Sequence, residues 1–343
     1  MRKKKSAYAA AGVDIDEMHV ALKAIRRVVK STNTRGVLSE LGTFGGMFAS
    51  PGKDHALVAS TDSVGTKLKI AVMAGRHDTV GQDIVNHCVN DILVQGARPL
   101  FFLDYLGISK LTAALFREIV SGLSKACRRN GCALLGGEIA ELPGLYPEKE
   151  YDLVGTIVGS VEKKRVVTGR TIRAGDVLIG LASSGLHTNG YSLARKVVFE
   201  TAGLTVDRRF PGTRRTVADV LLAPHRSYLS PVLAVMAKVK VHGMAHITGG
   251  GLVDNVPRVI PRGLSAVIDR AAWTVPPVFR FIRDAGAIDR EEMYRVFNMG
   301  IGYVLAVRPR AAEEALRLLR QSRVRARAIG SVTEGKQGVV LEN

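Results

Sequence analysis

The chain has 343 residues, of which 46% are apolar and 23% charged, a composition typical of a folded soluble protein with room for two domains. No apolar stretch reaches the roughly 18 to 20 residues that span a bilayer, and no apolar segment follows the basic residues 2–5, so neither a membrane anchor nor a secretory signal is expected. The formal net charge of +18 suggests nucleic-acid binding as an alternative function. The basic residues are scattered, however, and only 6% of the residues are aromatic, which disfavours this function.

The predicted elements of the first half follow from apolar periodicity and from glycine-rich breaks. They are a helix over 13–30, a glycine-rich segment at 41–48, strands at 56–59, 100–103, 132–135 and 151–161, and helices over 80–95 and 111–130. Gly131 is expected to end the last of these helices. The three cysteines, Cys88, Cys127 and Cys132, show no paired spacing, so we expect buried thiols and a cytoplasmic protein.

A charged, turn-rich stretch at 162–175 is interpreted as a linker, which predicts domains over 1–165 and 172–343. Beyond it we expect a strand at 177–181, a loop at 183–190, helices over 224–239, 276–285 and 311–322, and short strands at 328–332 and 339–341. Strands and helices alternate in both halves. The fold class is therefore predicted as α/β, with mixed α and β layers in two domains.

Residues 61–67 (TDSVGTK) form the first candidate segment for chemistry. Asp62 could hold Mg²⁺, Gly65 and Thr66 could receive a phosphate, and Lys67 could neutralise it. The spacing is not that of a P-loop, and a tight turn after a strand is an equal alternative.

The helix predicted over 80–95 carries the second candidate, the pair Asn90 and Asp91, which could join the same nucleotide site. Asp83 and His87 share the polar face of this helix. For these two we expect only a solvated surface, because a polar helix face needs no function.

Two further segments combine glycines with polar side chains. Residues 136–144 (GGEIAELPG) are expected to form a loop after a buried strand, with Gly136, Gly137 and Glu138 near a phosphate; an acidic turn is the alternative, above all for Glu141. In 183–190 (SSGLHTNG), His187 could act as an acid or base. Residues 246–251 (HITGGG) repeat the theme, and three consecutive glycines imply a backbone requirement.

In this order and at these separations, the segments resemble the phosphoribosylformylglycinamidine cyclo-ligase family. The matching residues are 8, 11–15, 61–67, 89–91, 95–96, 99–105, 136–138, 187–192, 222–224, 246–251, 255–258, 292–295 and 297–298. Each motif alone is weak, but the ordered set covers nearly the whole chain and is specific. Thiamine-monophosphate kinase and selenophosphate synthetase, of the same ATP-binding superfamily, are the nearest rivals.

The resemblance implies an ATP-dependent ring closure, in which formylglycinamidine ribonucleotide becomes 5-aminoimidazole ribonucleotide with release of ADP and phosphate. The formyl oxygen is thought to be phosphorylated first, which turns it into a good leaving group. The resemblance also implies ATP and Mg²⁺ as cofactors, and a homodimer whose N-terminal sheets join in a barrel.

The family's functional residues carry over to positions of this chain as expectations. Asp62 and Asp91 resemble the metal ligands. The expected ATP or phosphate contacts are Asp62, Gly65, Thr66, Lys67, Asn90, Asp91, Gly136, Gly137 and Glu138. The expected substrate-side residues are His187, Thr188, Asn189, His246 and Thr248, and the expected catalytic residues are His187, Lys67 and Arg26. Arg26 stands where many members have Lys, and an arginine can hardly lose its proton.

Overall fold

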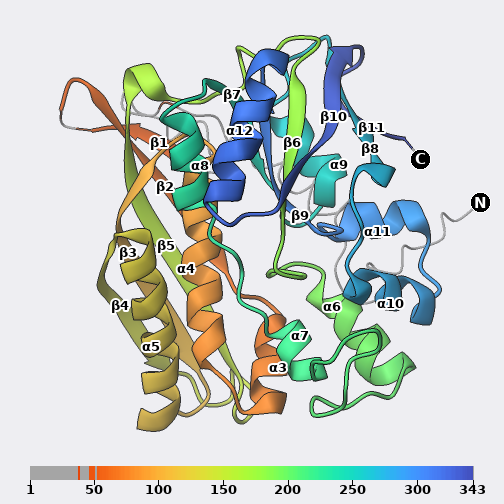
Figure 1. Cartoon of the computed structure of the whole chain (residues 1–343). Helices are drawn as coiled ribbons and strands as arrows, with labels where there is room; N and C mark the ends of the chain where they lie inside the picture. Colours follow the sequence, from red (N-terminus) through yellow and green to blue (C-terminus); the bar gives the residue numbers. More distant parts are fainter. Residues whose placement is uncertain (1–37, 39–45, 51, 343) are drawn as a thin grey trace, which may run out of the picture.

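The computed structural model of the chain describes residues 38, 46–50 and 52–342, so the helix predicted over 13–30, and with it Arg26, lies outside the described residues. The described part contains two sheets, each with helices packed on it, and the longest helix of the first half, α5, stands beside α4 (Figure 1). No helix in these ranges is long and apolar enough to cross a membrane.

The first sheet has the strand order β1-β2-β5-β3-β4. Its strands are β1 (Gly46–Ala49), β2 (His55–Ser63), β3 (Arg98–Ile108), β4 (Ala133–Glu141) and β5 (Tyr151–Glu162). The helices of this half are α3 (Lys67–Ala74), α4 (Asp78–Leu93) and α5 (Ala113–Asn130). As predicted, α5 ends at Gly131, which has a left-handed φ of 66°.

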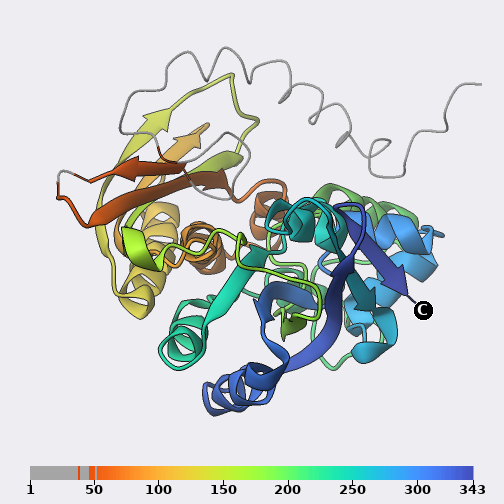
Figure 2. The same ribbon diagram turned by 90° about the horizontal axis from the view of Figure 1, so that it is seen from above.

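Helices α4 and α5 approach each other backbone to backbone. A Cβ on Gly81 would lie 2.4 Å from the carbonyl oxygen of Ile119, and one on Gly122 would lie 2.2 Å from that of Asp78. Since only glycine permits this contact, the two helices pack tightly over one face of the sheet. The opposite face of the sheet carries neither helix (Figures 1 and 2).

The second sheet has the order β11-β8-β10-β6-β9-β7. Its strands are β6 (Val177–Ala182), β7 (Val241–His246), β8 (Leu264–Asp269), β9 (Ile301–Val307), β10 (Ala326–Glu334) and β11 (Val339–Glu342). Its helices are α6 (Tyr191–Arg195), α7 (Val217–Leu221), α8 (Leu229–Met236), α9 (Gly251–Asn255), α10 (Pro277–Ala285), α11 (Arg290–Val296) and α12 (Pro309–Gln321). The α/β fold class is confirmed, with one mixed sheet in each half.

Three expectations need correction. The predicted loop at 136–144 is strand through Glu141, because β4 pairs with β3 along its length. The helix predicted over 224–239 is shorter, since α8 begins at Leu229. The polar face of α4 is not solvated: Asp83 and His87 are 0% and 3% exposed, because residues of the second half cover this face.

Candidate active site

The two halves of the chain meet along the polar face of α4. Strand β2 brings Asp62 to this line, and α4 contributes Asp83, His87 and Asp91. From the second half come the loop that carries His187, the segment that carries His225, and His246 at the end of β7. Polar groups from distant parts of the sequence are thus collected in one buried cluster.

His87 lies between two carboxylates. Its Nε2 is 2.9 Å from Oδ2 of Asp62 and 3.6 Å from Oδ2 of Asp91. Burial opposes the charge on His87, but the two carboxylates outweigh it and raise the pKa of His87 to about 9. Burial likewise opposes ionisation of Asp62, yet His87 and the backbone N–H of Ser63 leave the pKa of Asp62 below its ordinary value. At neutral pH this is a carboxylate–imidazolium–carboxylate arrangement.

A chain of hydrogen bonds leads from His87 back to Asp91. His87 Nδ1 is 2.7 Å from Oγ1 of Thr188, which is 3.3 Å from Nδ1 of His225. His225 Nε2 is 3.0 Å from Nε2 of His246, whose Nδ1 is 2.8 Å from Oδ1 of Asp91. When His87 is protonated, every hydrogen bond of the chain can have one donor and one acceptor. Each group then donates to the next one, in the direction of Asp91. The chain can therefore carry a proton shift without leaving a buried group unpaired.

His187 is held as a neutral imidazole. Its ring stacks on that of His225 at 4.0 Å, and its Nε2 accepts the backbone N–H of Ser184 at 3.1 Å. Burial, together with His246 and Lys67, holds the pKa of His187 well below its usual value. The backbone φ of His187 is 62°, a left-handed conformation that costs energy in a non-glycine residue and often marks a functional position.

Lys67 points into the protein, contrary to the expectation that it faces a phosphate. Its Nζ is 2.8 Å from Oδ2 of Asp83, and it donates to the carbonyl oxygens of His187 at 3.1 Å and Ala223 at 2.9 Å. Burial lowers the pKa of Lys67, and Asp83 opposes this shift. The ammonium group fixes the loop of His187, so it acts on the site through that loop.

Gly65 and Thr66 lie at an open cavity. Together with Ser63 they line a space of about 290 Å³ next to the N-terminus of α3. Gly65 has a left-handed φ of 69° and is exposed, and Thr66 Oγ1 is 3.1 Å from Oγ of Ser192 on α6. The backbone N–H groups of a helix start favour an anion here, whereas Glu150 and Asp152, which also line the cavity, disfavour one on their side.

The glycine turn after β7 is held by one side chain. Asn255 Nδ2 donates to the carbonyl oxygens of Gly249 at 3.1 Å and Gly251 at 2.7 Å, and its Oδ1 accepts from Thr248 Oγ1 at 3.2 Å. A Cβ on Gly249 would lie 3.2 Å from Oδ1 of Asn189. Asn189 and Thr248, two of the expected substrate-side residues, thus lie at the same turn.

Other expected contacts lie elsewhere. Asn90 is fully buried, and its amide bonds to the backbone of Arg226 at 2.8 Å and of Tyr228 at 2.9 Å, so it secures the joint between the halves. Gly137 and Glu138 are on β4, which strands β5 and β3 separate from β2. Three inter-strand steps of about 4.8 Å put them about 14 Å from Asp62 within one chain.

The oxygen ligands in the cluster suit Mg²⁺ better than the nitrogens do. The side chain of Asp62 is 41% exposed, so its oxygens can accept a further partner from the open side. Asp91 is only 6% exposed, and its oxygens already accept from Ser60 and His246. Asp62 is therefore suited to bind the metal directly, and Asp91 is suited to supply negative charge behind it.

Two sets with histidine nitrogens also bring ligand atoms within 4.8 Å of one another. They are His187, His225 and His246, and His87, Asp91 and His246. Such nitrogen-rich sets suit transition metals, but here the nitrogens of His225 and His246 face each other at hydrogen-bond distance.

The sequence interpretation missed His87, Asp83 and His225 as members of the site. For His87 and Asp83 a signal existed, since His87 lies four residues before Asp91 and Asp83 lies four residues before His87 along one helix face. His225 had no such signal, because its neighbours along the chain have no phosphate-binding pattern.

Comparisons with known proteins identify the family. The family model described as AIR synthase related protein, N-terminal domain, matches residues 44–161, and the corresponding C-terminal domain matches 173–342. Proteins named phosphoribosylformylglycinamidine cyclo-ligase from Alkaliphilus metalliredigens (strain QYMF) and Geotalea daltonii (strain DSM 22248 / JCM 15807 / FRC-32) are 46% and 49% identical, and each alignment covers 98% of both chains.

Solved structures share the fold at low sequence identity. Thiamine-monophosphate kinase from Stenotrophomonas maltophilia K279a has a TM-score of 0.65 at 15% identity, covering 94% of this chain and 96% of that one. The hydrogenase maturation protein HypE in complex with ATP has a TM-score of 0.62 at 19% identity, covering 96% and 92%. The sequence identity to the cyclo-ligases, over nearly the full length, is far higher than the identity to this kinase. The chain therefore belongs to the phosphoribosylformylglycinamidine cyclo-ligase family.

Proposed function

We propose that this protein catalyses the ATP-dependent cyclisation of formylglycinamidine ribonucleotide to 5-aminoimidazole ribonucleotide, with release of ADP and phosphate, in purine biosynthesis. The observation that carries the proposal is the placement of His87 between Asp62 and Asp91, in the same cluster as the neutral His187. Phosphorylation of the formyl oxygen requires charged groups that attract the metal ion and the phosphates. Ring closure requires a neutral group that can take part in proton transfer.

ATP and Mg²⁺ are assigned to the side of the cluster that opens at Asp62. The phosphates would lie against the backbone of Gly65 and Thr66, beside the cavity of about 290 Å³. Mg²⁺ would neutralise phosphate charge there, with Asp62 as its ligand and Asp91 behind it. The fold relative HypE, solved in complex with ATP, supports nucleotide use by this architecture.

His187 is assigned to the substrate side, together with Thr188, Asn189, His246 and Thr248. A neutral imidazole can accept the proton that the ring nitrogen loses when it attacks the activated carbon, once Nε2 of His187 releases the backbone N–H of Ser184 that it accepts in this structure. Thr188 bonds to His87 and His225, so it links this side to the carboxylates. Arg26 remains a predicted catalytic residue, and Gly136, Gly137 and Glu138 remain predicted ATP or phosphate contacts.

A homodimer is the proposed assembly, joined through the first sheet. Helices α4 and α5 cover one face of this sheet (Figure 2). Large apolar side chains remain exposed on its strands. These are Phe48, Leu100, Leu103, Leu135 and Ile139, which are 37% to 63% exposed. Contact with a second copy of the chain would remove these apolar side chains from solvent.

The three cysteines are free, in keeping with the cytoplasmic location we propose.

The test is to mix the purified protein with formylglycinamidine ribonucleotide, ATP and Mg²⁺ and to measure ADP and aminoimidazole ribonucleotide together. We expect equal amounts of both products, lost in Asp62→Asn and kept in Asp207→Asn, a control at an exposed aspartate. ADP without the imidazole product would indicate another phosphate acceptor. A folded protein that forms neither product would refute the proposal.

A further inference from the structure

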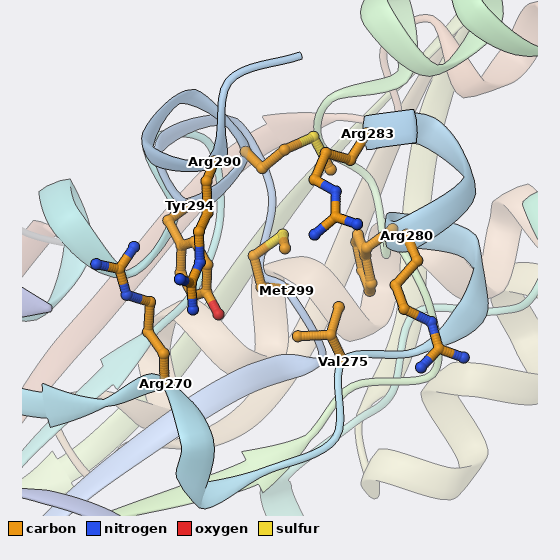
Figure 3. A pocket seen from close by; sticks show the side chains of 9 residues that line it. Arg270, Val275, Arg280, Arg283, Arg290, Tyr294 and Met299 are labelled. Carbon is orange, nitrogen blue, oxygen red and sulfur yellow. The ribbon is translucent and has the colours of Figure 1, made fainter. Parts of the chain in front are cut away.

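An arginine-lined cavity and a pair of thiols both lie outside the candidate active site. The cavity, of about 310 Å³, lies between α10 and α11, and its lining includes Arg270, Arg280 and Arg283 (Figure 3). Its inner wall is closed, since Tyr294 and Met299 are only 2% and 4% exposed. The cavity therefore presents charge but little surface that would select a ligand. The thiols of Cys127 and Cys132 differ from it, because one helix ending holds them together.

Cys127 and Cys132 occupy paired positions where α5 ends. Gly131 has a left-handed φ of 66°, and its N–H donates to the carbonyl oxygen of Arg128 at 3.2 Å. The N–H of Cys132 donates to the carbonyl oxygen of Cys127 at 3.1 Å. These two bonds define the Schellman motif, in which the residue after the glycine contacts a side chain in the last turn of the helix. Apolar side chains commonly make that contact, and here two cysteines occupy its positions.

The backbone at this helix ending permits a disulfide. A carbonyl oxygen lies about 2.4 Å and an amide nitrogen about 1.5 Å from its own Cα, so the bond of 3.1 Å keeps the two Cα atoms at most about 7 Å apart. A disulfide requires Cα atoms no further apart than about 7 Å. Sγ of Cys132 lies 3.7 Å from the carbonyl oxygen of Cys127, so this side chain already points back toward the end of α5.

The two thiols differ in reactivity and in exposure. Hydrogen bonding between them lowers the pKa of Cys132 and raises the pKa of Cys127, so Cys132 loses its proton first. The C-terminal end of a helix disfavours a thiolate, but Arg128 and Arg129 in the last turn offset this effect. Cys132 is half-buried, whereas Cys127 is only 2% exposed. An oxidant therefore reaches Cys132 first, with Cys127 beside it to complete the bond.

The proposed dimer leaves this pair uncovered. Cys132 directly precedes β4, along which side chains alternate between the two faces of the sheet. Cys132 and Leu134 share the face that packs on the core, on the side of α5. Leu135, which is 63% exposed, belongs to the opposite face, where the second copy is proposed to bind.

The same helix ending is bonded to the second half of the chain through Asn130. This residue is 6% exposed, and its Nδ2 donates to Oδ1 of Asn86 on α4 at 2.8 Å. Its Oδ1 accepts from Oγ of Ser227 at 2.6 Å. Asn86 in turn donates to the carbonyl oxygen of His225 at 2.7 Å. A covalent bond between positions 127 and 132 encloses Asn130, so it restricts the opening of these contacts.

We propose that Cys127 and Cys132 form a reversible disulfide, which holds the end of α5, and with it Asn130, against the second half of the chain. The oxidant is a small disulfide such as oxidised glutathione. The thiolate of Cys132 attacks it, which forms a mixed disulfide and releases one glutathione thiolate. Cys127 then gives its proton to water and attacks Sγ of Cys132, which releases the second glutathione thiolate. Two protein thiols are oxidised, and one glutathione disulfide is reduced to two thiols.

Such bonds are transient in reducing compartments, where they serve as sensors, and both thiols are free in this structure. The experiment equilibrates the folded full-length protein in glutathione buffers with an increasing oxidised fraction. Free thiols are counted after acid quenching and denaturation. We expect two of the three thiols to be lost and that of the fully buried Cys88 to remain. Peptide mass mapping should locate the bond between Cys127 and Cys132.

Two variants separate the pair from the third cysteine. Cys88→Ala is the matched control and should lose both of its remaining thiols in the same buffers. Cys132→Ser should keep both of its thiols, because Cys127 then has no partner. Three thiols that persist in excess oxidised glutathione would refute the disulfide. So would glutathione that stays on Cys132, or a bond between two chains on a non-reducing gel.

Hydrogen exchange measured by mass spectrometry tests the link through Asn130. Oxidation should slow the exchange of residues 128–132 at least about tenfold, because the bond prevents fraying of the helix end. It should also slow the exchange of residues 225–228 at least about twofold, through Ser227 and Asn86. Cys132→Ser should show neither change. Slower exchange confined to residues 128–132 would overturn the link to the second half of the chain.

Discussion

Nζ of Lys67 lies 2.8 Å from Oδ2 of Asp83, and both side chains are fully buried. Lys67 also donates to the carbonyl oxygen of His187, and Asp83 accepts the backbone N–H of His225 at 2.6 Å. One ion pair of the first half therefore holds two segments of the second half, each of which supplies a histidine to the cluster.

We expect Lys67→Met to lower the free energy of unfolding by about 3 to 5 kcal/mol, because it leaves a buried carboxylate without its partner. Urea denaturation measures this loss. Lys69→Met is the matched control: Lys69 pairs with Glu150 but is 40% exposed, so its loss should cost less than about 1 kcal/mol. The variant Lys67→Met/Asp83→Leu should be more stable than Lys67→Met alone, since no charge remains unpaired. Equal losses at Lys67 and Lys69 would contradict the structural role of the buried pair.

His225 is predicted to position the reacting groups without touching the substrate. In His225→Phe an aromatic ring remains, but Nε2 of His246 loses its partner and Thr188 keeps its bond to His87 but not that to His225, at a cost of about 1 to 3 kcal/mol for an unpaired buried group. We expect kcat to fall about tenfold or more, with a small change in KM for ATP. Steady-state kinetics separate the two constants.

The control for His225 is His242→Phe, which removes another buried histidine, paired with Asp176 at the other end of β7. It should lower stability and leave kcat nearly unchanged. If both variants lose kcat equally, the hydrogen-bond chain has no specific part in the reaction.

Gly190 tests how tightly the His187 loop is packed. It has a left-handed φ of 77°, and a Cβ there would lie 2.3 Å from Cε1 of the buried Phe297. Gly175 has a similar φ of 87° but nothing within 4 Å, so Gly175→Ala measures the backbone strain alone, about 1 to 2 kcal/mol. We expect Gly190→Ala to cost at least about 1 kcal/mol more, in thermal or urea unfolding. Equal costs would show that Phe297 moves aside freely.

Local patterns were enough to predict most of the elements. The period of α4 and the glycine after α5 depend on neighbouring residues, and both were predicted correctly. The length of β4 was not, because Gly136 and Gly137 suggest a loop while pairing with β3 keeps them extended. Tertiary hydrogen bonds decided that segment, and they involve residues more than 30 positions away.

The site was predictable as a set of motifs but not as a geometry. Asp62, Asp91, His187 and His246 were all named from sequence, and they lie in one cluster. The direction of Lys67 could not be foreseen, since it depends on Asp83 and on the carbonyl oxygen of Ala223, 156 positions further on. Polar residues on a helix face normally indicate a solvent-exposed surface. On α4 they are buried only because the second half of the chain packs against that face.

The proposed dimer predicts a clear result at Leu103. This side chain is 37% exposed on β3, next to the buried Phe102, which points toward α4. Leu103→Asp would place an unpaired charge in the proposed interface, and we expect the dimer dissociation constant to rise at least about a hundredfold. Analytical ultracentrifugation over a range of concentrations measures it. Val340→Asp, at a side chain 50% exposed on β11 of the other sheet, should leave the dimer intact. A dimer that tolerates Leu103→Asp but not Val340→Asp would move the interface to the second sheet.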